Sequence, residues 1–134
     1  MSLSPLGNFA STDPDARERW LIGESQVLSA IAMGAPLREI LTGIVQLVES
    51  QDTEMIASIL LLDEDGCMRL GAAPSLPTRY LNQIEGLAIG PQVGSCGTAM
   101  YRREAVISSD ISTDPLWEAY RDCALECGLH ASWS

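Results

Sequence analysis

The residues best suited to chemistry lie in one glycine-punctuated stretch near the middle of the chain, residues 89–117. It reads IGPQVGSCGTAMYRREAVISSDISTDPLW and places Cys96 between Gly94 and Gly97, where a short helix is expected to begin. A cysteine near a helix N-terminus can have a lowered thiol pKa, which favours the nucleophilic thiolate. Cysteine also packs as a small apolar residue. Cys96 is therefore either a redox-active or ligand-contacting thiol, or a small residue at a point of close packing.

Two aspartates later in the stretch could contribute polar contacts. Asp110 follows the polar pair Ser108-Ser109 at the end of an expected strand, and its carboxylate could orient a ligand. Asp114 precedes Pro115, which is the pattern of a helix N-cap followed by the first helical residue, so we expect a cap there. Backbone N–H groups at the two helix starts can bind an anion or a polar molecule.

Aromatic side chains could complete such a site. Trp117, Tyr120 and Trp133 could stack on a planar ligand, although aromatic residues at helical spacing also form cores. The chain lacks the patterns of other sites: one histidine, His130, and four scattered cysteines do not have zinc-ligand spacing, and no GxxxxGK loop is present. We therefore expect neither a metal nor a cofactor.

Composition limits the class of protein. The chain has 134 residues, of which 46% are hydrophobic, so it can bury one core. Its net charge is −10 with only eight lysines and arginines, which argues against nucleic acid and anionic membrane as partners. No apolar run approaches the roughly 20 residues that cross a bilayer, and no signal peptide is visible. We expect free thiols and a cytoplasmic location.

The first half of the chain predicts two helices and a hairpin. Residues 1–12 are a loose lead-in. The pair Asp13-Pro14 signals the start of a helix that runs to Met33, and Gly34-Ala35-Pro36 ends it. Trp20, Val27, Leu28 and Ile31 share one face of that helix. The next helix has a single apolar stripe formed by Leu37, Ile40, Leu41, Ile44, Val45 and Val48.

A strand over residues 55–62 has apolar side chains on both of its faces, which predicts a central strand covered on both sides. The acidic turn at 63–66 lacks the ligand pattern of a calcium loop and reads as a hairpin turn, with the return strand over 67–73. Helices are then expected over 78–84, 95–102 and 115–127, and strands over 105–109 and 129–133. The order predicts an α+β fold around an antiparallel sheet, divided into residues 1–12, an N-terminal linker or dimerisation helix at 13–34, and a domain at 35–134.

Four segments in this order resemble the GAF domain, a small-molecule sensing module: SILLLDEDG, GAAPSLPTRY, IGPQVGSCGTAMYRREAVISSDISTDPLW and ALECGLHASWS. The similarity covers about residues 36–134 and is greatest to the bacterial subgroup found with diguanylate cyclase (GGDEF), phosphodiesterase (EAL) and histidine-kinase outputs. It implies an antiparallel sheet with helices on both faces, a ligand held between one face and the loop-helix excursion, and terminal helices that pair two copies into a dimer and lead to the output domain.

Two departures from that family matter. The family continues past Trp133-Ser134 through two more strands and a closing helix, so the expected sheet is truncated at its C-terminus. Ser132 stands where the subgroup often has a cysteine. The residues that we expect to contact the ligand are Ser95, Cys96, Thr98, Ile107, Ser109, Asp110, Leu116, Trp117, Tyr120 and Trp133.

Three functions follow from these observations. The first is a regulatory module without catalysis of its own, which binds an unidentified small molecule, forms a homodimer and passes the ligand state to an attached output domain. The second is a thiol-dependent reductase of free methionine sulfoxide, with Cys96 as the first thiol. The third is a purely structural dimerisation module.

Overall fold

A computed structural model describes residues 13–134, and its elements confirm the α+β fold. The predicted lead-in at residues 1–12 lies outside this range. The chain divides into two compact units. Among the described residues, the first comprises 13–59 together with Gly71–Ser75, and the second comprises Leu60–Leu70 and Leu76–Ser134. Within the described range, no helix has the length and apolar content that crossing a membrane requires.

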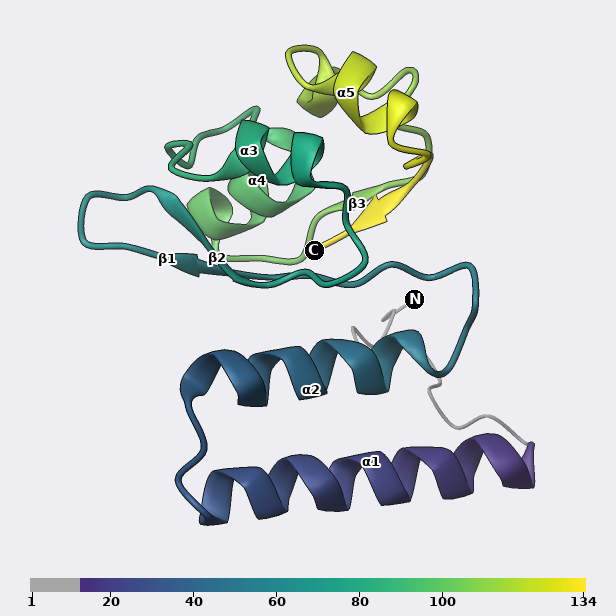
Figure 1. The fold of residues 1–134 in the computed structure, drawn as a ribbon. Coiled ribbons are helices and arrows are strands. Elements are labelled where there is room, and N and C mark those ends of the chain that lie inside the picture. The colour runs from purple at the N-terminus through teal and green to yellow at the C-terminus, as the bar shows by residue number, and fades with distance from the viewer. Residues whose placement is uncertain (1–12) are drawn as a thin grey trace. The chain divides into compact units, whose positions relative to one another are not determined.

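The first unit is built on the predicted pair of helices, α1 (Pro14–Ala32) and α2 (Leu37–Glu49) (Figure 1). The Asp13 carboxylate caps α1 by accepting a hydrogen bond from the Asp15 N–H at 3.1 Å. At the other end, Gly34 adopts a φ of +72° that suits glycine, so the chain can reverse into α2. Both helices begin at the predicted residue, and α1 ends one residue before the predicted Met33.

Two glycines set how closely α1 and α2 pack. A Cβ added to Gly23 would lie 2.5 Å from Leu47 Cδ1, so this position has room only for hydrogen. A Cβ on Gly43 would lie 3.5 Å from Val27 Cγ2, an ordinary contact. After α2, the Glu49 carboxylate accepts hydrogen bonds from the Ala57 N–H at 2.9 Å and the Ser75 hydroxyl at 2.7 Å, and thereby holds two later segments to the helix.

The predicted hairpin is present as β1 (Ile59–Leu62) and β2 (Met68–Ala72), which form a two-stranded sheet. The Asp63 carboxylate shapes the turn by accepting hydrogen bonds from the N–H groups of Asp65 at 2.9 Å and Cys67 at 2.8 Å, and from Arg69 Nε at 2.8 Å. Gly66 supplies the positive φ of 76°. These bonds to the ionised form lower the pKa of the Asp63 carboxyl.

The expectation of a central strand covered on both faces is wrong for β1. The strand begins four residues later than predicted, and Leu61 and Leu62 are 39% and 51% exposed. The physical reason is that β1 has only β2 as a ladder partner within residues 13–134, so it lies in a sheet of two strands and is not enclosed by layers.

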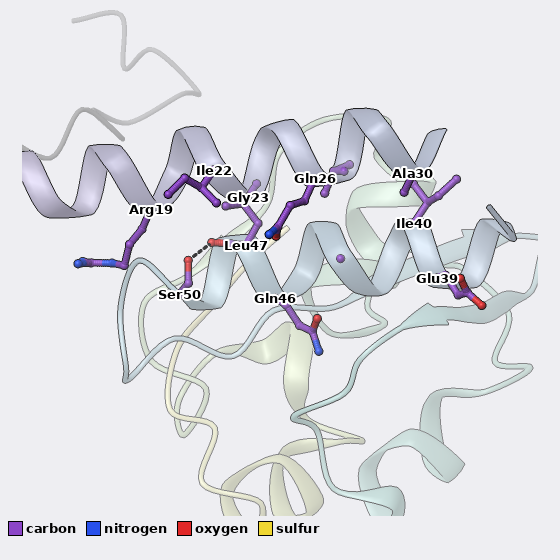
Figure 2. Close-up of a pocket in the computed structure, with 12 residues that line it drawn as sticks. Arg19, Ile22, Gly23, Gln26, Ala30, Glu39, Ile40, Gln46, Leu47 and Ser50 are labelled. Carbon is purple, nitrogen blue, oxygen red and sulfur yellow. Dashed lines mark hydrogen bonds between the residues drawn. The ribbon is translucent and has the colours of Figure 1, made fainter. Parts of the chain in front are cut away.

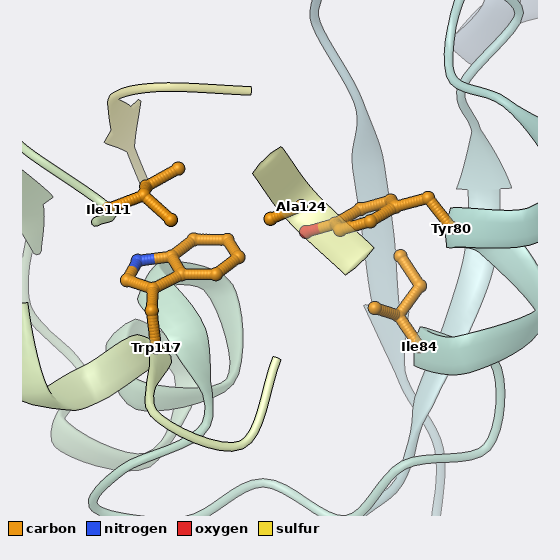
Figure 3. Packing of buried hydrophobic residues seen from close by; sticks show 5 residues of the cluster. All are labelled: Tyr80, Ile84, Ile111, Trp117 and Ala124. Atoms are coloured by element: carbon orange, nitrogen blue, oxygen red, sulfur yellow. The ribbon is translucent and has the colours of Figure 1, made fainter. Parts of the chain in front are cut away.

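The second unit contains α3 (Thr78–Ile84), α4 (Gly94–Arg102), β3 (Ile107–Ser108), the 3-10 helix η1 (Pro115–Trp117), α5 (Arg121–Glu126) and β4 (Ser132–Trp133). Strands β3 and β4 pair antiparallel, with Ile107 opposite Trp133 and Ser108 opposite Ser132. The strands of the described chain thus form two separate two-stranded sheets instead of one. A hydrophobic cluster fills the unit and consists of Tyr80, Ile84, Ile111, Trp117 and Ala124 (Figure 3).

The single helix predicted over 115–127 is wrong, because η1 and α5 are separate. Arg121 explains the break: its Nε donates to the Ile111 carbonyl and its Nη2 to the Asp114 carbonyl, both at 3.0 Å. These two bonds fold the segment back on itself before α5 begins. The end of α5 matches the prediction, since Gly128 adopts a φ of +81° after the helix.

Candidate ligand site

The N-terminus of α4 packs against the indole ring of Trp117. Gly94 starts the helix with a φ of +55°, and a Cβ added there would lie 3.4 Å from Trp117 Cη2. One turn into the helix, a Cβ on Gly97 would lie 2.6 Å from Val93 Cγ1. The two glycines around Ser95 and Cys96 therefore allow the loop, the helix and the ring to approach one another closely.

Two buried hydroxyls on α4 differ in their partners. Thr98 is fully buried, and its Oγ1 accepts a hydrogen bond from the Val93 N–H at 3.0 Å, which supplies a cap that the helix start otherwise lacks. Ser95 is also fully buried, but its Oγ has no hydrogen-bond partner in the described part of the chain. Thr98 is thus accounted for by the fold, while Ser95 is not.

Ser108 Oγ and Trp117 Nε1, like Ser95 Oγ, are buried polar atoms without a hydrogen-bond partner in the described part of the chain. The side chains of Ser108 and Trp117 are 1% and 3% exposed, and neither polar atom has a partner within residues 13–134. We call Ser95, Ser108 and Trp117 the unpartnered triad. Its members come from α4, β3 and η1, and these elements belong to one packed unit in which α4 contacts both η1 and the strand paired with β3. Figure 3 shows the Trp117 indole beside Ile111 in this unit.

Buried polar groups nearly always have hydrogen-bond partners, because leaving one without a partner costs about 1–3 kcal/mol. The triad offers two hydroxyls, which can donate or accept, and one indole N–H, which can only donate. Such a set suits a polar molecule that carries at least one acceptor. The hydrophobic cluster that contains Trp117 adds aliphatic and aromatic side chains, the usual lining of small-molecule sites.

Strand β3 has the opposite orientation from the one that we expected: Ile107 and Ser109, which we expected to contact the ligand, face away from the core. Ile107 is 66% exposed and Ser109 is also exposed, whereas Val106 and Ser108 are buried. Side chains alternate along a strand, so only one parity can face the core. Val106 is buried, so the core-facing side of the strand carries Val106 and, two residues later, Ser108. This alternation identifies Ser108, and not Ile107 or Ser109, as a residue that faces the interior.

The other expected aromatic and aliphatic contacts divide between core and surface. Leu116 and Tyr120 pack on the hydrophobic cluster that contains Trp117. Trp133 lies at the end of β4 and is 53% exposed. The structure therefore brings Leu116, Trp117 and Tyr120 together but leaves the Trp133 ring half in solvent.

The two aspartates have roles within the backbone. Asp114 is the expected cap, since its carboxylate accepts a hydrogen bond from the Leu116 N–H at 2.9 Å. Asp110 is exposed, and its carboxylate accepts from the Ser112 hydroxyl at 2.5 Å and from the Ser112 N–H at 2.9 Å. These bonds lower the pKa of the Asp110 carboxyl. Both carboxylates are thus engaged in local turns.

Cys96 does not have the properties of an activated thiol. Burial raises the pKa of its thiol, and its Sγ lies 3.1 Å from the Ser134 hydroxyl. The position near a helix N-terminus does not offset this desolvation, since the pKa stays above that of an ordinary thiol. All four cysteines are free thiols, and the described residues contain no group of three or more potential metal ligands.

Comparison with known proteins finds a sensor-named relative. The chain is 34% identical over 118 residues to the "methyl sulfide methyltransferase-associated sensor" of Methanosarcina acetivorans. The match covers 87% of this chain but only 12% of that protein. No family model matches the chain. No solved structure matches it. The chain is therefore similar to one segment of a much longer protein that is named as a sensor.

Proposed function

We propose that this chain is a sensory domain of the GAF type that binds a small polar molecule at the unpartnered triad. The observation that carries the proposal is that Ser95 Oγ, Ser108 Oγ and Trp117 Nε1 are all buried without a hydrogen-bond partner among residues 13–134. Three such atoms within one small unit leave hydrogen-bonding capacity that this part of the chain does not use. A bound molecule would satisfy them and recover the free energy that their burial costs.

Two further observations support a sensory role. The relative from Methanosarcina acetivorans is named as a sensor, and the similarity covers 87% of this chain. The ordered motifs of residues 36–134 resemble the GAF domain, whose members bind ligands next to the corresponding loop-helix segment. In this proposal the domain itself is not catalytic, and ligand binding changes its packing in a way that an attached output domain detects.

The proposal can be tested by thermal unfolding of the whole chain with a panel of probes: cyclic nucleotides, free amino acids, dimethyl sulfide and a low-molecular-mass cell extract. A ligand present at about 100 times its Kd stabilises the folded state by about 2.7 kcal/mol, so a binder raises Tm clearly. We expect Ser108→Ala to lose most of that rise and Ser109→Ala, the exposed neighbour, to retain it. An equal response of the two variants, or no rise with any probe including the extract, would refute binding at the triad.

A structural dimerisation module is the second candidate, because Trp117 packs directly on Gly94 and is 3% exposed. In that case the indole simply fills the space that we assign to a ligand. Ser95→Ala and Ser108→Ala would then stabilise the protein equally with and without every probe, since each removes an unsatisfied hydroxyl. The reductase alternative is disfavoured by the raised pKa of the Cys96 thiol.

A further inference from the structure

Two features of the structure lie outside the unpartnered triad: a groove between α1 and α2, and a pair of cysteines at α5. The groove has a volume of about 410 Å³ and belongs to the first unit (Figure 2). Its Ser50 hydroxyl donates to the Leu47 carbonyl at 2.7 Å, and none of its side chains is a buried polar group without a partner among residues 13–134. The groove thus offers no buried polar atom in need of a ligand, whereas the cysteines offer two nucleophilic groups.

Cys123 lies in α5, and Cys127 follows four residues later at the end of the helix. The turn between them is intact, because the Cys127 N–H donates to the Cys123 carbonyl at 3.1 Å. Side chains at this spacing are neighbours on a helix surface. Desolvation raises the pKa of the Cys123 thiol, and the charge of the Cys127 thiol and a hydrogen bond with it raise this pKa further. Both thiols are free and only partly buried, so a small molecule can reach them from solvent.

The two thiols lie at the edge of the hydrophobic cluster. Both cysteines pack against the cluster that includes Tyr80 and Ala124, and Figure 3 shows these two residues side by side. Desolvation raises the pKa of the Tyr80 phenol, and the charges of Cys96, Cys123 and Cys127 raise it further. A group bound by Cys123 and Cys127 would therefore lie near an aromatic ring.

The geometry of the pair suits a bridging atom better than a disulfide or a zinc ion. Cβ atoms four residues apart on a helix are about 5–6 Å from each other. A disulfide needs about 3.5–4.5 Å between them, so a direct bond would distort the end of α5. Zinc prefers four ligands, and the described residues contain no group of three or more potential metal ligands. A centre that needs only two protein sulfurs and carries its own third substituent fits the pair.

We propose that Cys123 and Cys127 form a binding site for trivalent organoarsenicals, R–As(OH)2, which the two thiols hold through two arsenic–sulfur bonds. Each bond forms as a thiol sulfur displaces one hydroxyl from arsenic, and the thiol proton leaves with that hydroxyl as water. Two molecules of water are released, arsenic stays trivalent, and no oxidant or reductant takes part. Protonated thiols suit this step because it consumes their protons, whereas a metal ion requires deprotonated thiols.

The test adds phenylarsine oxide, which water hydrates to such an arsenical, in slight excess to the full chain. Intact-mass spectrometry should show one phenylarsenic group per chain, with the loss of two thiol hydrogens. Two of the four thiols should then resist alkylation, and peptide mapping should identify them as Cys123 and Cys127. An excess of glutathione, which has one thiol, should leave the adduct in place, while the dithiol dimercaptopropanol should remove it.

Variants of the pair test whether both thiols are required at this spacing. Cys123→Ser and Cys127→Ser should each weaken binding at least about a hundredfold, because a single thiol loses the second, intramolecular bond. The matched control D122C/C123S keeps four cysteines but moves one to an exposed neighbouring position that does not face Cys127. It should bind as weakly as the single variants. Cys67→Ser, in the hairpin, should bind like wild type.

Thermal unfolding of every variant checks that it is folded. The proposal is overturned if wild type takes up no phenylarsenic group, if the protected thiols include Cys67 or Cys96, or if D122C/C123S binds as tightly as wild type. Ser108→Ala, which should lose the response to a polar ligand at the unpartnered triad, should retain arsenical binding. The proposed sensory function and the arsenical site can therefore fail separately.

Discussion

At the residue scale, Ser95 and Thr98 provide the clearest contrast, because both are fully buried on α4 and, in the described part of the chain, only Thr98 has a hydrogen-bond partner. We expect Thr98→Val to lower the free energy of unfolding by about 1–2 kcal/mol, since the Val93 N–H loses its acceptor. Ser95→Ala should leave the ligand-free protein unchanged or stabilise it by up to about 1 kcal/mol, because it removes an unsatisfied hydroxyl. Urea unfolding measures both. A loss of stability in Ser95→Ala as large as that in Thr98→Val would show that Ser95 has a structural partner.

The buried thiol of Cys96 should make the free energy of unfolding depend on pH in the alkaline range. Its folded-state pKa is raised above the value of 9.0 for an unperturbed thiol, so the folded state holds its proton where the unfolded chain has lost it. The resulting stability is present in full below the unfolded pKa and is lost as pH rises through the folded pKa. Cys96→Ala should therefore reduce the decline in unfolding free energy between neutral pH and pH values above 9.0.

Alkylation measures the same property directly. Under iodoacetamide, the modification rate of Cys96, followed by mass spectrometry, should still be rising beyond pH 9.0. Cys67 serves as an internal control because its thiol lies outside the buried core. If the Cys96 rate instead reached its plateau near neutral pH, the thiol would be activated and the reductase alternative would regain support.

Residue types identified caps better than they identified the ligand-facing residues. Asp13 and Asp114 could be assigned from sequence because a cap depends only on a few neighbouring residues. Ile107 and Ser109 faced the other way because the orientation of a strand depends on which parity packs on the core, and that is a tertiary property. The unpartnered state of Ser108 and Trp117 could not be predicted, since it depends on every group packed around them.

At the element scale, the sequence predicted the helices and the tight turn, but it did not predict how the elements are separated and paired. The apolar stripe of α2 and the Asp-Gly turn of the hairpin both have local causes, and both are in the structure. The break between η1 and α5 has a non-local cause, because it depends on Arg121 reaching back to the carbonyl of Ile111. The exposure of β1 likewise depends on how many strands pair with it, which the composition of one strand does not specify.

Two helix-interior glycines make opposite predictions for substitution by alanine. A Cβ on Gly97 would lie 2.7 Å from Val93 Cβ, an atom that cannot move without the backbone, so Gly97→Ala must displace the start of α4. We expect it to lower the free energy of unfolding by about 1–3 kcal/mol. Gly43→Ala meets only an ordinary contact at 3.5 Å, so the better helix propensity of alanine should stabilise α2 by up to about 1 kcal/mol. Denaturant unfolding of the two variants compares them, and equal effects would contradict the packing described at α4.

At the scale of the whole molecule, the described chain forms two compact units, and the proposed ligand site lies in the second of them. A sensory role requires that ligand binding there be energetically coupled to another equilibrium of the protein, such as the dimerisation that the resemblance to the GAF domain implies. Because coupling is reciprocal, a ligand that changes the dimer Kd by some factor must bind the dimer and the monomer with affinities that differ by the same factor. Sedimentation equilibrium with and without a binding probe measures the dimer Kd in both states, and we expect the two values to differ. A ligand that leaves the dimer Kd unchanged would show that dimerisation does not transmit its signal.

The most direct test of the central claim is the indole N–H resonance of Trp117 in a nitrogen-15 NMR spectrum. The chain has three tryptophans, so three indole signals are expected, and Trp117→Phe identifies the relevant one. Addition of the low-molecular-mass cell extract should shift the Trp117 signal, leave the Trp20 signal in α1 unchanged, and have no such effect in Ser108→Ala. A Trp117 signal that stays fixed in wild type throughout this titration would contradict the account, and the buried indole would then be a core residue only.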